Sequence, residues 1–135
     1  MITELTGLDI SNASLLDEAT AAAEAMTMAF STHNMKRKMF YVSNSMFPQI
    51  TDVINTRASL NGITLVVGEI EDFPWSRADE FCGLVCQTPD NLGNIKDFTA
   101  LFSRLRENKV RSIVCADLMS LCIVKSPGAM GADIA

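Results

Sequence analysis

Three short apolar runs constrain the fold of this 135-residue chain more than any other feature. They occupy residues 63–67, 81–86 and 112–116. Apolar residues follow one another in these runs, whereas a strand with one face in water would alternate apolar and polar residues. Such strands are typical of a parallel sheet that is covered on both faces. We therefore expect all three runs to be central, parallel strands.

Helical patterns separate the runs and complete the expected architecture. Helices are expected at residues 14–33, 48–61 and 98–108, and a further short strand at 39–42. This alternation predicts an α/β fold with three αβα layers around a mostly parallel sheet. Residues 1–135 are expected to form a single α/β domain. Because the chain stops without a polar tail and its first ten residues provide no complete element, we expect it to be a segment of a longer chain.

The net charge of −5 argues against several classes of protein. A nucleic-acid-binding surface needs clustered Lys and Arg, and the one basic run, residues 36–38, is expected to be a solvated helix end. No apolar run approaches the roughly 20 residues that cross a bilayer. We therefore expect neither a nucleic-acid nor a membrane partner.

The cysteines and the single histidine are expected to be structural. Cys82 and Cys86 stand four residues apart in one expected strand and should therefore face the same way. Neither they nor Cys115 and Cys122 have the spacing of a zinc or redox motif, so we expect reduced, apolar-like cysteines and no metal site. His33 falls at an expected helix C-terminus, where a protonated imidazole is favourable.

An alanine-rich segment, residues 12–26, begins the first long helix. Ser14 followed by Asp17 resembles a capping box, which predicts that the helix starts at Ser14. The small side chains of Ala21, Ala22 and Ala25 share a face and allow another backbone to approach closely. Two interpretations of this face stay open: it is an association surface, or it packs on the sheet of the same domain.

Ligands of open parallel sheets bind at the carboxyl ends of the strands. The chain offers three places there, namely Ser43-Asn44, residues 87–93 and Asp117. Asp117 ends an apolar run abruptly, and two roles stay open for it: a cap of the following turn, or a contact to a ligand such as a protonated ring nitrogen. No Gly-rich phosphate loop is present.

Three longer segments resemble one family. TGLD (residues 6–9) and NASLLDEATAAAEAM (residues 12–26) are similar to a stretch that is characteristic of the N-terminal half of the glycine decarboxylase (P-protein) family. Residues 88–101 and 116–135 resemble the family's PD-x-x-G-x-x-x-DFT-x-L and DLL-x-L-x-I-x-x-PG-x-x-G-x-DIA stretches. The resemblance therefore covers nearly the whole chain in one order.

The resemblance implies that the chain is part of the large domain of a fold-type-I pyridoxal-phosphate enzyme of the glycine cleavage system. Such an oxidoreductase releases carbon dioxide from glycine and passes the aminomethyl group to the lipoyl arm of H-protein. The resemblance also implies two cofactor-binding positions. Asp117 falls where this fold places the aspartate that holds the pyridine nitrogen, and Ser14 falls where a helix N-terminus holds the phosphate.

The same resemblance implies that this chain belongs to the non-catalytic half. Leu15 and Leu16 follow Ser14 and would crowd a phosphate, and the Schiff-base lysine of the family belongs to the C-terminal half. Lys125 stands too early to be that lysine. We expect no catalytic residue and no bound cofactor in the segment. Its partners would be the catalytic half and H-protein, in a dimer or heterotetramer.

Two other functions stay open. One is a free-standing flavodoxin-like ligand-binding module with its site at Asp117 or at residues 87–93. The other is the large domain of another fold-type-I enzyme, such as an aminotransferase. If the family resemblance holds, the enzyme is expected in the mitochondrial matrix of a eukaryote or in the cytoplasm of a bacterium.

Overall fold

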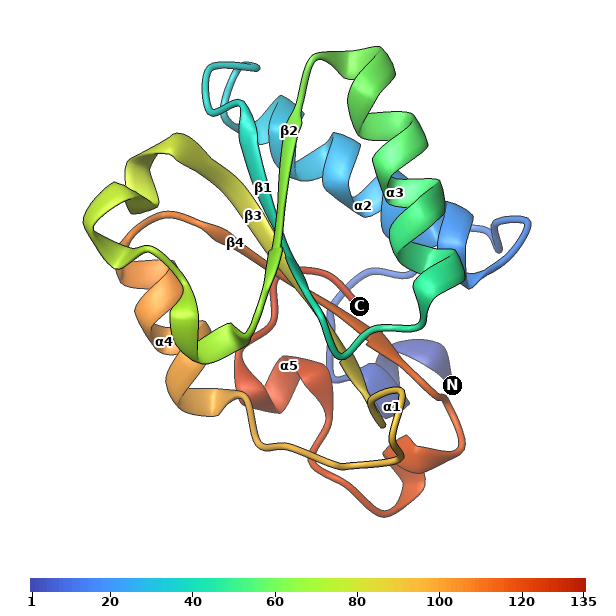
Figure 1. The fold of residues 1–135 in the computed structure, drawn as a ribbon. Coiled ribbons are helices and arrows are strands. Elements are labelled where there is room, and N and C mark those ends of the chain that lie inside the picture. Colours follow the sequence, from blue (N-terminus) through green and yellow to red (C-terminus); the bar gives the residue numbers. More distant parts are fainter.

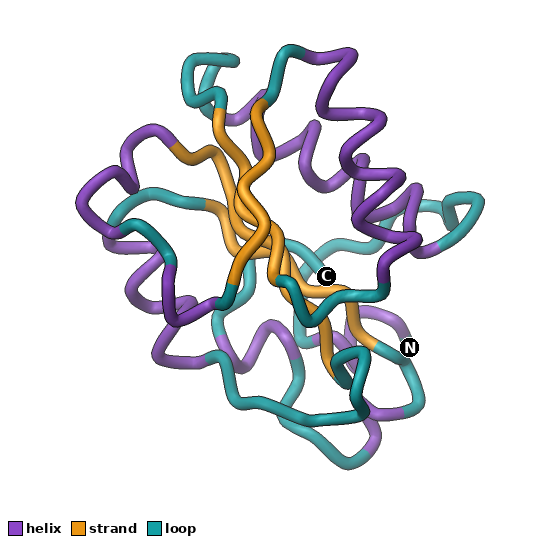
Figure 2. The backbone as a smooth tube through the Cα atoms, in the orientation of Figure 1, coloured by secondary structure: helices purple, strands orange, loops and turns teal.

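A computed structural model describes all 135 residues and contains one four-stranded sheet (Figure 1, Figure 2). Its strands are β1 (Met39–Ser43), β2 (Thr64–Gly68), β3 (Phe81–Thr88) and β4 (Arg111–Ala116). They lie in the order β2-β1-β3-β4, and every neighbouring pair is parallel. The α-helices are α1 (Ile2–Thr6), α2 (Glu18–Thr32), α3 (Pro48–Asn61), α4 (Thr99–Glu107) and α5 (Pro127–Met130). Short 3₁₀ turns are η1 (Ile70–Asp72), η2 (Trp75–Glu80) and η3 (Ser120–Cys122).

Helices cover both faces of the sheet, which confirms the expected three-layer architecture (Figure 1). α2 and α3 pack on one face, over buried side chains that include Phe40, Ile54 and Val85. α4 and α5 pack on the other face, over a second core that includes Leu84 and Phe102. Removal of this apolar surface from water is the main driving force for the fold. None of the helices has the length and apolar character that a membrane span requires.

Strand β2 is an edge strand, which corrects the expectation that residues 63–67 form a central one. The two inner strands are β1 and β3. In β2 both Thr64 and Val67 are exposed, the latter by 52%. β4 lies at the other end of the order, so the expectation that residues 112–116 form a central strand is also wrong; only an isolated parallel bridge from Ile113 to Ile134 lies beyond it. Because β-branched residues suit edge and central strands alike, the apolar run alone could not reveal the order.

A β-bulge separates the two cysteines of β3. The register between β1 and β3 shifts by one residue, and Cys82 is left without a partner in β1. A bulge of this kind reverses the alternation of side chains. Cys82 therefore faces the α2–α3 side, whereas Cys86 faces the α4 side. The expectation that they face the same way is wrong, but both are buried, as is Cys115, and all four cysteines are free.

Helix α2 starts four residues later than the capping-box pattern predicts. Its N-cap is Asp17 rather than Ser14, and the Asp17 Oδ1 accepts a hydrogen bond of 2.7 Å from the Thr20 amide. A carboxylate at the N-cap satisfies a free amide and interacts favourably with the helix dipole, so it fixes the start. Ser14 lies in the exposed segment before the helix. A further difference is α1, which shows that the first ten residues do form an element.

The alanine-rich face of α2 belongs to the core of this domain. Ala22 and Ala25 are buried among side chains of α3 and the sheet. The small side chains let the helix lie close to β3, where a Cβ built on Gly83 would stand 3.3 Å from the Cβ of Ala29. The second of the two interpretations is therefore confirmed for Ala22 and Ala25, whereas Ala21 is only partly buried.

Candidate functional site

Loops at the carboxyl edge of the sheet enclose a cavity of about 650 Å³. Its walls come from the start of α2, the β1–α3 loop, the β3–α4 loop and the residues after β4. The lining residues are Glu18, Phe47, Gln87, Thr88, Pro89, Asp90, Asn91, Gly93, Ala116, Asp117 and Leu118. Two of the three predicted places, residues 87–93 and Asp117, therefore meet in one cavity, as a parallel sheet requires.

The third predicted place, Ser43-Asn44, takes no part in the cavity. The Ser43 Oγ lies 2.8 Å from the Ser45 Oγ, and the Asn44 Nδ2 donates to the Glu69 Oε1 at 2.8 Å. The first contact lies within the β1–α3 connection, and the second joins this connection to the residue after β2. Ser43 and Asn44 therefore have a structural role.

Hydrogen bonds from one side chain anchor the β3–α4 loop. The Gln87 Oε1 accepts a hydrogen bond from the Phe47 amide at 3.1 Å, and the Gln87 Nε2 donates to the Pro89 carbonyl at 3.1 Å. Gln87 is buried, so both the oxygen and the nitrogen of its side-chain amide need hydrogen-bond partners. The side chain thereby fixes the position of this cavity wall.

Asp90 shapes the same loop from within. Its Oδ1 accepts hydrogen bonds from the Asn94 amide at 2.8 Å and from the Leu92 amide at 2.9 Å. These bonds, with Asn94 contributing most, lower the pKa of Asp90. The carboxylate is therefore engaged in folding the loop.

Asp117 caps the turn that follows β4. Its Oδ2 accepts a hydrogen bond of 3.0 Å from the Ser120 amide, and its carbonyl oxygen accepts one of 2.7 Å from the Ser120 Oγ. The first of the two roles left open by the sequence is thus present. The exposed carboxylate also borders the cavity, so the ligand-contact role remains geometrically open.

Three carboxylates line the cavity: Asp90, which its loop amides engage, and Glu18 and Asp117, which form no ion pair. Burial, together with the negative charge of Asp117, raises the pKa of Glu18. No Lys, Arg or His belongs to the lining. The sequence interpretation treated Glu18 only as a favourable helix charge. A signal was nevertheless present, because a helix that precedes a parallel strand begins at the carboxyl edge, where Asp117 also lies.

Exposed apolar side chains stand on the same loops as the cavity walls. The segment before α2 and the loops after β3 and β4 carry Leu16, Leu92, Met119 and Ile123, which we call the apolar rim. Leu16 is the most exposed of them, at 88%. Single exposed apolar residues are ordinary, but a group of them at one edge is typical of a surface that another protein covers.

His33 lies at the opposite edge of the sheet, at the C-cap of α2, as predicted. Its Nε2 is buried and has no hydrogen-bond partner. Burial, followed by the charges of Arg37 and Arg111, lowers its pKa. The expectation of a favourable protonated imidazole is therefore wrong. Nowhere in the chain do three or more His, Cys, Asp or Glu side chains form a group that could hold a metal ion.

Comparison with known proteins decides the family. The family model for "Glycine cleavage system P-protein" matches residues 1–135. The chain belongs to the glycine cleavage system P-protein family. It is 50% identical over 134 residues to the glycine dehydrogenase (decarboxylating) of Shewanella frigidimarina and 45% identical over 135 residues to that of Akkermansia muciniphila. These matches cover 97% and 99% of this chain, which spans only 13% and 14% of the length of the two relatives.

Solved structures confirm the fold class. A glycine decarboxylase (P-protein) of the glycine cleavage system, in inhibitor-bound form, superposes with a TM-score of 0.88 at 32% identity, over 98% of this chain and 30% of that one. Cystathionine γ-lyases from Micromonospora echinospora and Lactobacillus plantarum superpose with TM-scores of 0.65 and 0.64, at 18% and 20% identity. The two matches cover 87% and 83% of this chain and 30% of each cystathionine γ-lyase chain. At this low identity they show only that the fold is shared.

The residues of the cavity do not fit the phosphate of pyridoxal phosphate. The helix N-terminus that would hold a phosphate begins with Asp17 and Glu18, and Asp117 adds a further carboxylate. Ser14, the predicted phosphate-binding position, does not line the cavity. Leu15 and Leu16, whose bulk the sequence analysis expected to crowd a phosphate, lie in the segment before the helix and are 44% and 88% exposed.

Proposed function

We propose that this chain is part of the non-catalytic half of a glycine decarboxylase. The whole enzyme would release carbon dioxide from glycine and pass the aminomethyl group to the lipoyl arm of H-protein. Pyridoxal phosphate, bound by the other half, would supply the electron sink for decarboxylation. This segment would supply a scaffold and an interface. Membership of the P-protein family favours this function over a flavodoxin-like module or an aminotransferase domain.

The charge of the cavity is the observation that carries the proposal. A phosphate dianion would meet Glu18 and Asp117 there without a Lys or Arg to balance it. Negative groups that share one site repel each other, and no cation of the lining offsets this repulsion. The pKa of Glu18 is raised first by desolvation and then by the negative charge of Asp117, so the two carboxylates already interact unfavourably. A half of the enzyme with this cavity is therefore poorly suited to bind the cofactor.

The lysines support the same assignment. A Schiff base requires a lysine whose amine reaches into the cavity. The Lys125 Nζ instead donates to the Thr99 Oγ1 at 2.6 Å and lies 3.9 Å from the Asp97 Oδ2. None of the five lysines of the chain lines the cavity.

The apolar rim supports an interface with the catalytic half. Leu16, Leu92, Met119 and Ile123 lie on the loops of the cavity edge and leave apolar surface in water unless another protein covers it. In this proposal the rim packs on the catalytic half, within a dimer or heterotetramer. Because the two relatives named above are bacterial, the proposed setting of the parent enzyme is a bacterial cytoplasm.

The substitution Asp117→Asn in the parent enzyme tests the proposal. An aspartate that held the pyridine nitrogen would be essential, and its loss would lower kcat by roughly 10²–10³-fold. In a non-catalytic half, kcat for glycine decarboxylation and the cofactor absorbance should stay within about twofold of the wild-type values. The matched control is Asp97→Asn, since the Asp97 carboxylate also accepts a hydrogen bond from a backbone amide but lies outside this cavity.

Borohydride trapping on the same enzyme provides a second readout. Reduction fixes the cofactor to the lysine that holds it, and peptide mapping then identifies that lysine. The proposal predicts an adduct outside residues 1–135. An adduct on Lys125, or on any other lysine of this chain, would contradict it.

A further inference from the structure

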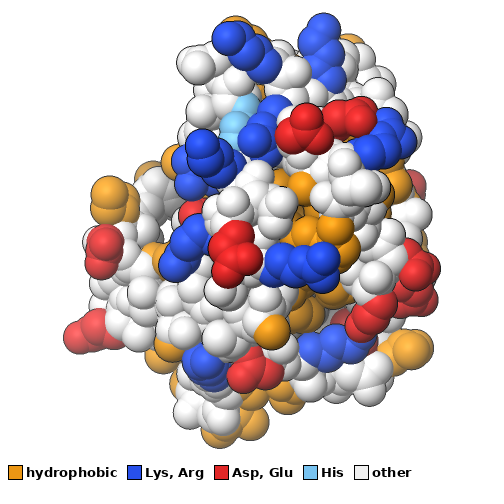
Figure 3. All heavy atoms as spheres, turned by 90° about the vertical axis from the view of Figure 1, so that its left-hand side faces the viewer, with side chains coloured by type: hydrophobic (Ala, Val, Ile, Leu, Met, Phe, Trp, Pro, Cys, Tyr) orange, Lys and Arg blue, Asp and Glu red, His pale blue; other side chains and the backbone are white.

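Most cationic side chains of this chain lie at the amino edge of the sheet, opposite the cavity. Eight of the eleven Lys and Arg residues stand in the segments that lead into β1, β3 and β4 or at the first residue of β4. They are Lys36, Arg37, Lys38, Arg77, Arg104, Arg106, Lys109 and Arg111, and we call this region the basic edge. Figure 3 shows Lys and Arg side chains gathered over the upper part of the face that it draws.

The charge of the basic edge has the opposite sign to that of the whole chain. The basic edge comprises residues 36–38, 75–80 and 104–111, whose only carboxylates are Asp79, Glu80 and Glu107. We add Asp133 to the count, because it pairs with Arg111. The basic edge therefore carries a net charge of +4, whereas the remainder of the chain carries −9 and the whole chain −5. The domain is strongly polarised along the strand direction.

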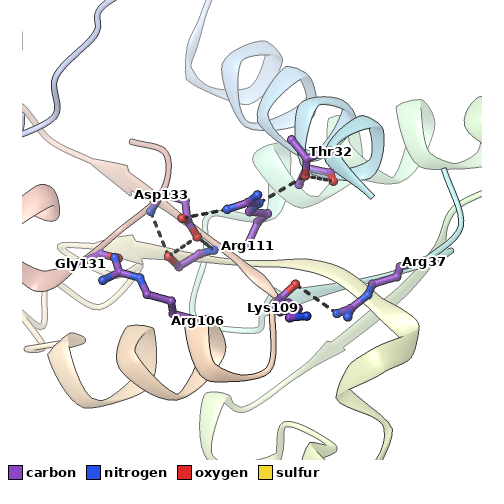
Figure 4. Close-up of polar contacts among 9 residues, drawn as sticks. Thr32, Arg37, Arg106, Lys109, Arg111, Gly131 and Asp133 are labelled. Atoms are coloured by element: carbon purple, nitrogen blue, oxygen red, sulfur yellow. Dashed lines mark hydrogen bonds and ion pairs between the residues drawn. The ribbon is translucent and has the colours of Figure 1, made fainter. Parts of the chain in front are cut away.

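One side chain, that of Arg37, joins the three segments of the basic edge, and Figure 4 shows its contact with Lys109. The Arg37 Nη1 lies between 3.1 and 3.4 Å from four backbone carbonyl oxygens, those of Ala78, Phe81, Asn108 and Lys109. Arg37 is therefore not part of a solvated helix end, as the sequence suggested for residues 36–38. The four acceptors are neutral, so they leave the positive charge of Arg37 uncompensated.

Ion pairs neutralise only a small part of the remaining charge. Within the basic edge only Arg77 and Arg111 form ion pairs, at 2.7 Å with Glu80 and at 3.3 Å with Asp133. Arg106 donates to a backbone carbonyl at 2.8 Å, as Figure 4 also shows. These contacts hold the arginines in place but leave a positive potential at the surface.

Lysines supply the free charge of this surface. Lys36, Lys38 and Lys109 are exposed, and none of them forms an ion pair. The neighbouring His33 lies in the same positive field. Its pKa is lowered first by burial and then by the charges of Arg37 and Arg111. A domain with a net charge of −5 thus contains a local region that repels protons.

Helix dipoles do not account for this distribution. Cations are favourable in the last turn of a helix, and α2, α3 and α4 all end at this edge because each leads into a parallel strand. However, the last turns of α2 and α3 contain no basic residue, and only α4 has two, Arg104 and Arg106. The free lysines stand in the connecting loops, where helix stability does not require them.

We propose that the basic edge is a docking surface for a short acidic segment of another protein. Complementary charge speeds association and sets the orientation of a partner. An extended polyanion such as DNA carries one charge per about 1.7 Å, and beyond the basic edge it would meet the strongly negative remainder of this domain. A short run of Asp and Glu can stay within the basic edge. The proposal is independent of which half of the enzyme the chain belongs to.

A binding experiment on the parent enzyme tests this surface. The probe is a fluorescent oligoglutamate peptide of roughly ten residues, at an ionic strength of about 0.15 M, where charges beyond about 8 Å are screened. We expect saturable binding that the double substitution Lys36→Glu and Lys38→Glu weakens at least about tenfold. The matched control is Lys96→Glu with Lys125→Glu, which changes the net charge equally but lies outside the basic edge, and it should weaken binding less than about twofold.

Further measurements separate docking from folding and from nucleic-acid binding. The neutral pair Lys36→Gln and Lys38→Gln should give an intermediate affinity, and because both side chains are exposed the urea midpoint should not move. Equal weakening by the edge pair and the control pair would overturn the proposal. So would the absence of saturable binding, or tighter binding of a short DNA duplex than of the peptide at the same salt.

Discussion

The two edges of this sheet differ in charge and in closure. At the amino edge, arginine side chains bind backbone carbonyls of neighbouring segments, and lysines leave a positive surface. At the carboxyl edge, loops leave a cavity of about 650 Å³ with carboxylates in its lining and apolar side chains on its loops. One parallel sheet produces both edges, because all its strands run in one direction and sort the connections into two sets.

The comparison shows which groups have their contacts within the chain and which lack a partner there. At the amino edge, Arg37 and Arg106 bind backbone carbonyls of neighbouring segments, so folding explains where these two arginines lie, whereas the free lysines are left for the proposed acidic partner. The carboxyl edge leaves an unbalanced pair of carboxylates, Glu18 and Asp117, beside exposed apolar residues. Its geometry is explained better by a partner than by the stability of this domain.

Removal of the Arg37 guanidinium is expected to have the largest effect on stability. The substitution Arg37→Met keeps the apolar part of the side chain but removes an Nη1 group whose two N–H bonds are shared among four carbonyls, at a cost of about 2–3 kcal/mol in the free energy of unfolding. Urea unfolding at neutral pH measures it. The control Lys36→Met should change stability by less than about 0.5 kcal/mol, because Lys36 is exposed and makes no ion pair. Equal losses in the two variants would show that charge, not the carbonyl contacts, matters.

Much of the fold could be predicted from local sequence patterns. The helix at residues 48–61 is confirmed because Pro48 in its first turn and Gly62 at its end, with φ of 67°, are signals that act within a few residues. The order of the strands could not be predicted. Whether residues 63–67 lie at the centre or the edge depends on pairing between distant segments, and a run of β-branched residues fits both places.

The candidate site was only partly predictable for the same reason. Residues 87–93 and Asp117 were found because strand ends in a parallel sheet share one edge. Glu18 was missed, since its role depends on how close the start of α2 comes to Asp117. The face of the sheet on which Cys82 lies was also unpredictable. It depends on a bulge in the pairing of β1 with β3, which the sequence of β3 alone does not reveal.

The pH dependence of stability at the amino edge should follow His33. Burial, Arg37 and Arg111 lower the pKa of His33 in the folded chain, below the value of about 6.5 in the unfolded chain. The unfolded chain therefore binds a proton at a higher pH than the folded one. The stabilising contribution is fully present above about pH 6.5 and is lost as the pH falls through the folded-state pKa. The difference in urea midpoint between wild type and His33→Gln, measured from about pH 8 to pH 5, should reveal this loss; a midpoint difference that does not change over this range contradicts it.

The carboxyl edge should titrate in the opposite sense, with a smaller effect. Burial and Asp117 raise the pKa of Glu18 in the folded chain. The stabilising contribution of its protonated form is therefore present below the ordinary pKa of Glu and is lost as the pH rises through the folded-state pKa. NMR titration of the Glu18 carboxyl should show a lower pKa in the variant Asp117→Asn, still above the ordinary value because burial remains. Asp97→Asn should not move it, and an unchanged pKa in both variants would show that Glu18 does not sense Asp117.

Association of this half with the catalytic half tests the central claim most directly. With the two halves produced as separate polypeptides, sedimentation can compare Leu16→Asp at the apolar rim with Leu60→Asp on α3, where the wild-type side chains are 88% and 80% exposed. If the carboxyl edge is the interface, Leu16→Asp should raise the dissociation constant about tenfold or more, because it places a charge in an apolar contact. Leu60→Asp should leave it within about twofold, and neither variant should shift the unfolding midpoint of this chain. Equal dissociation constants for the two variants would contradict the account.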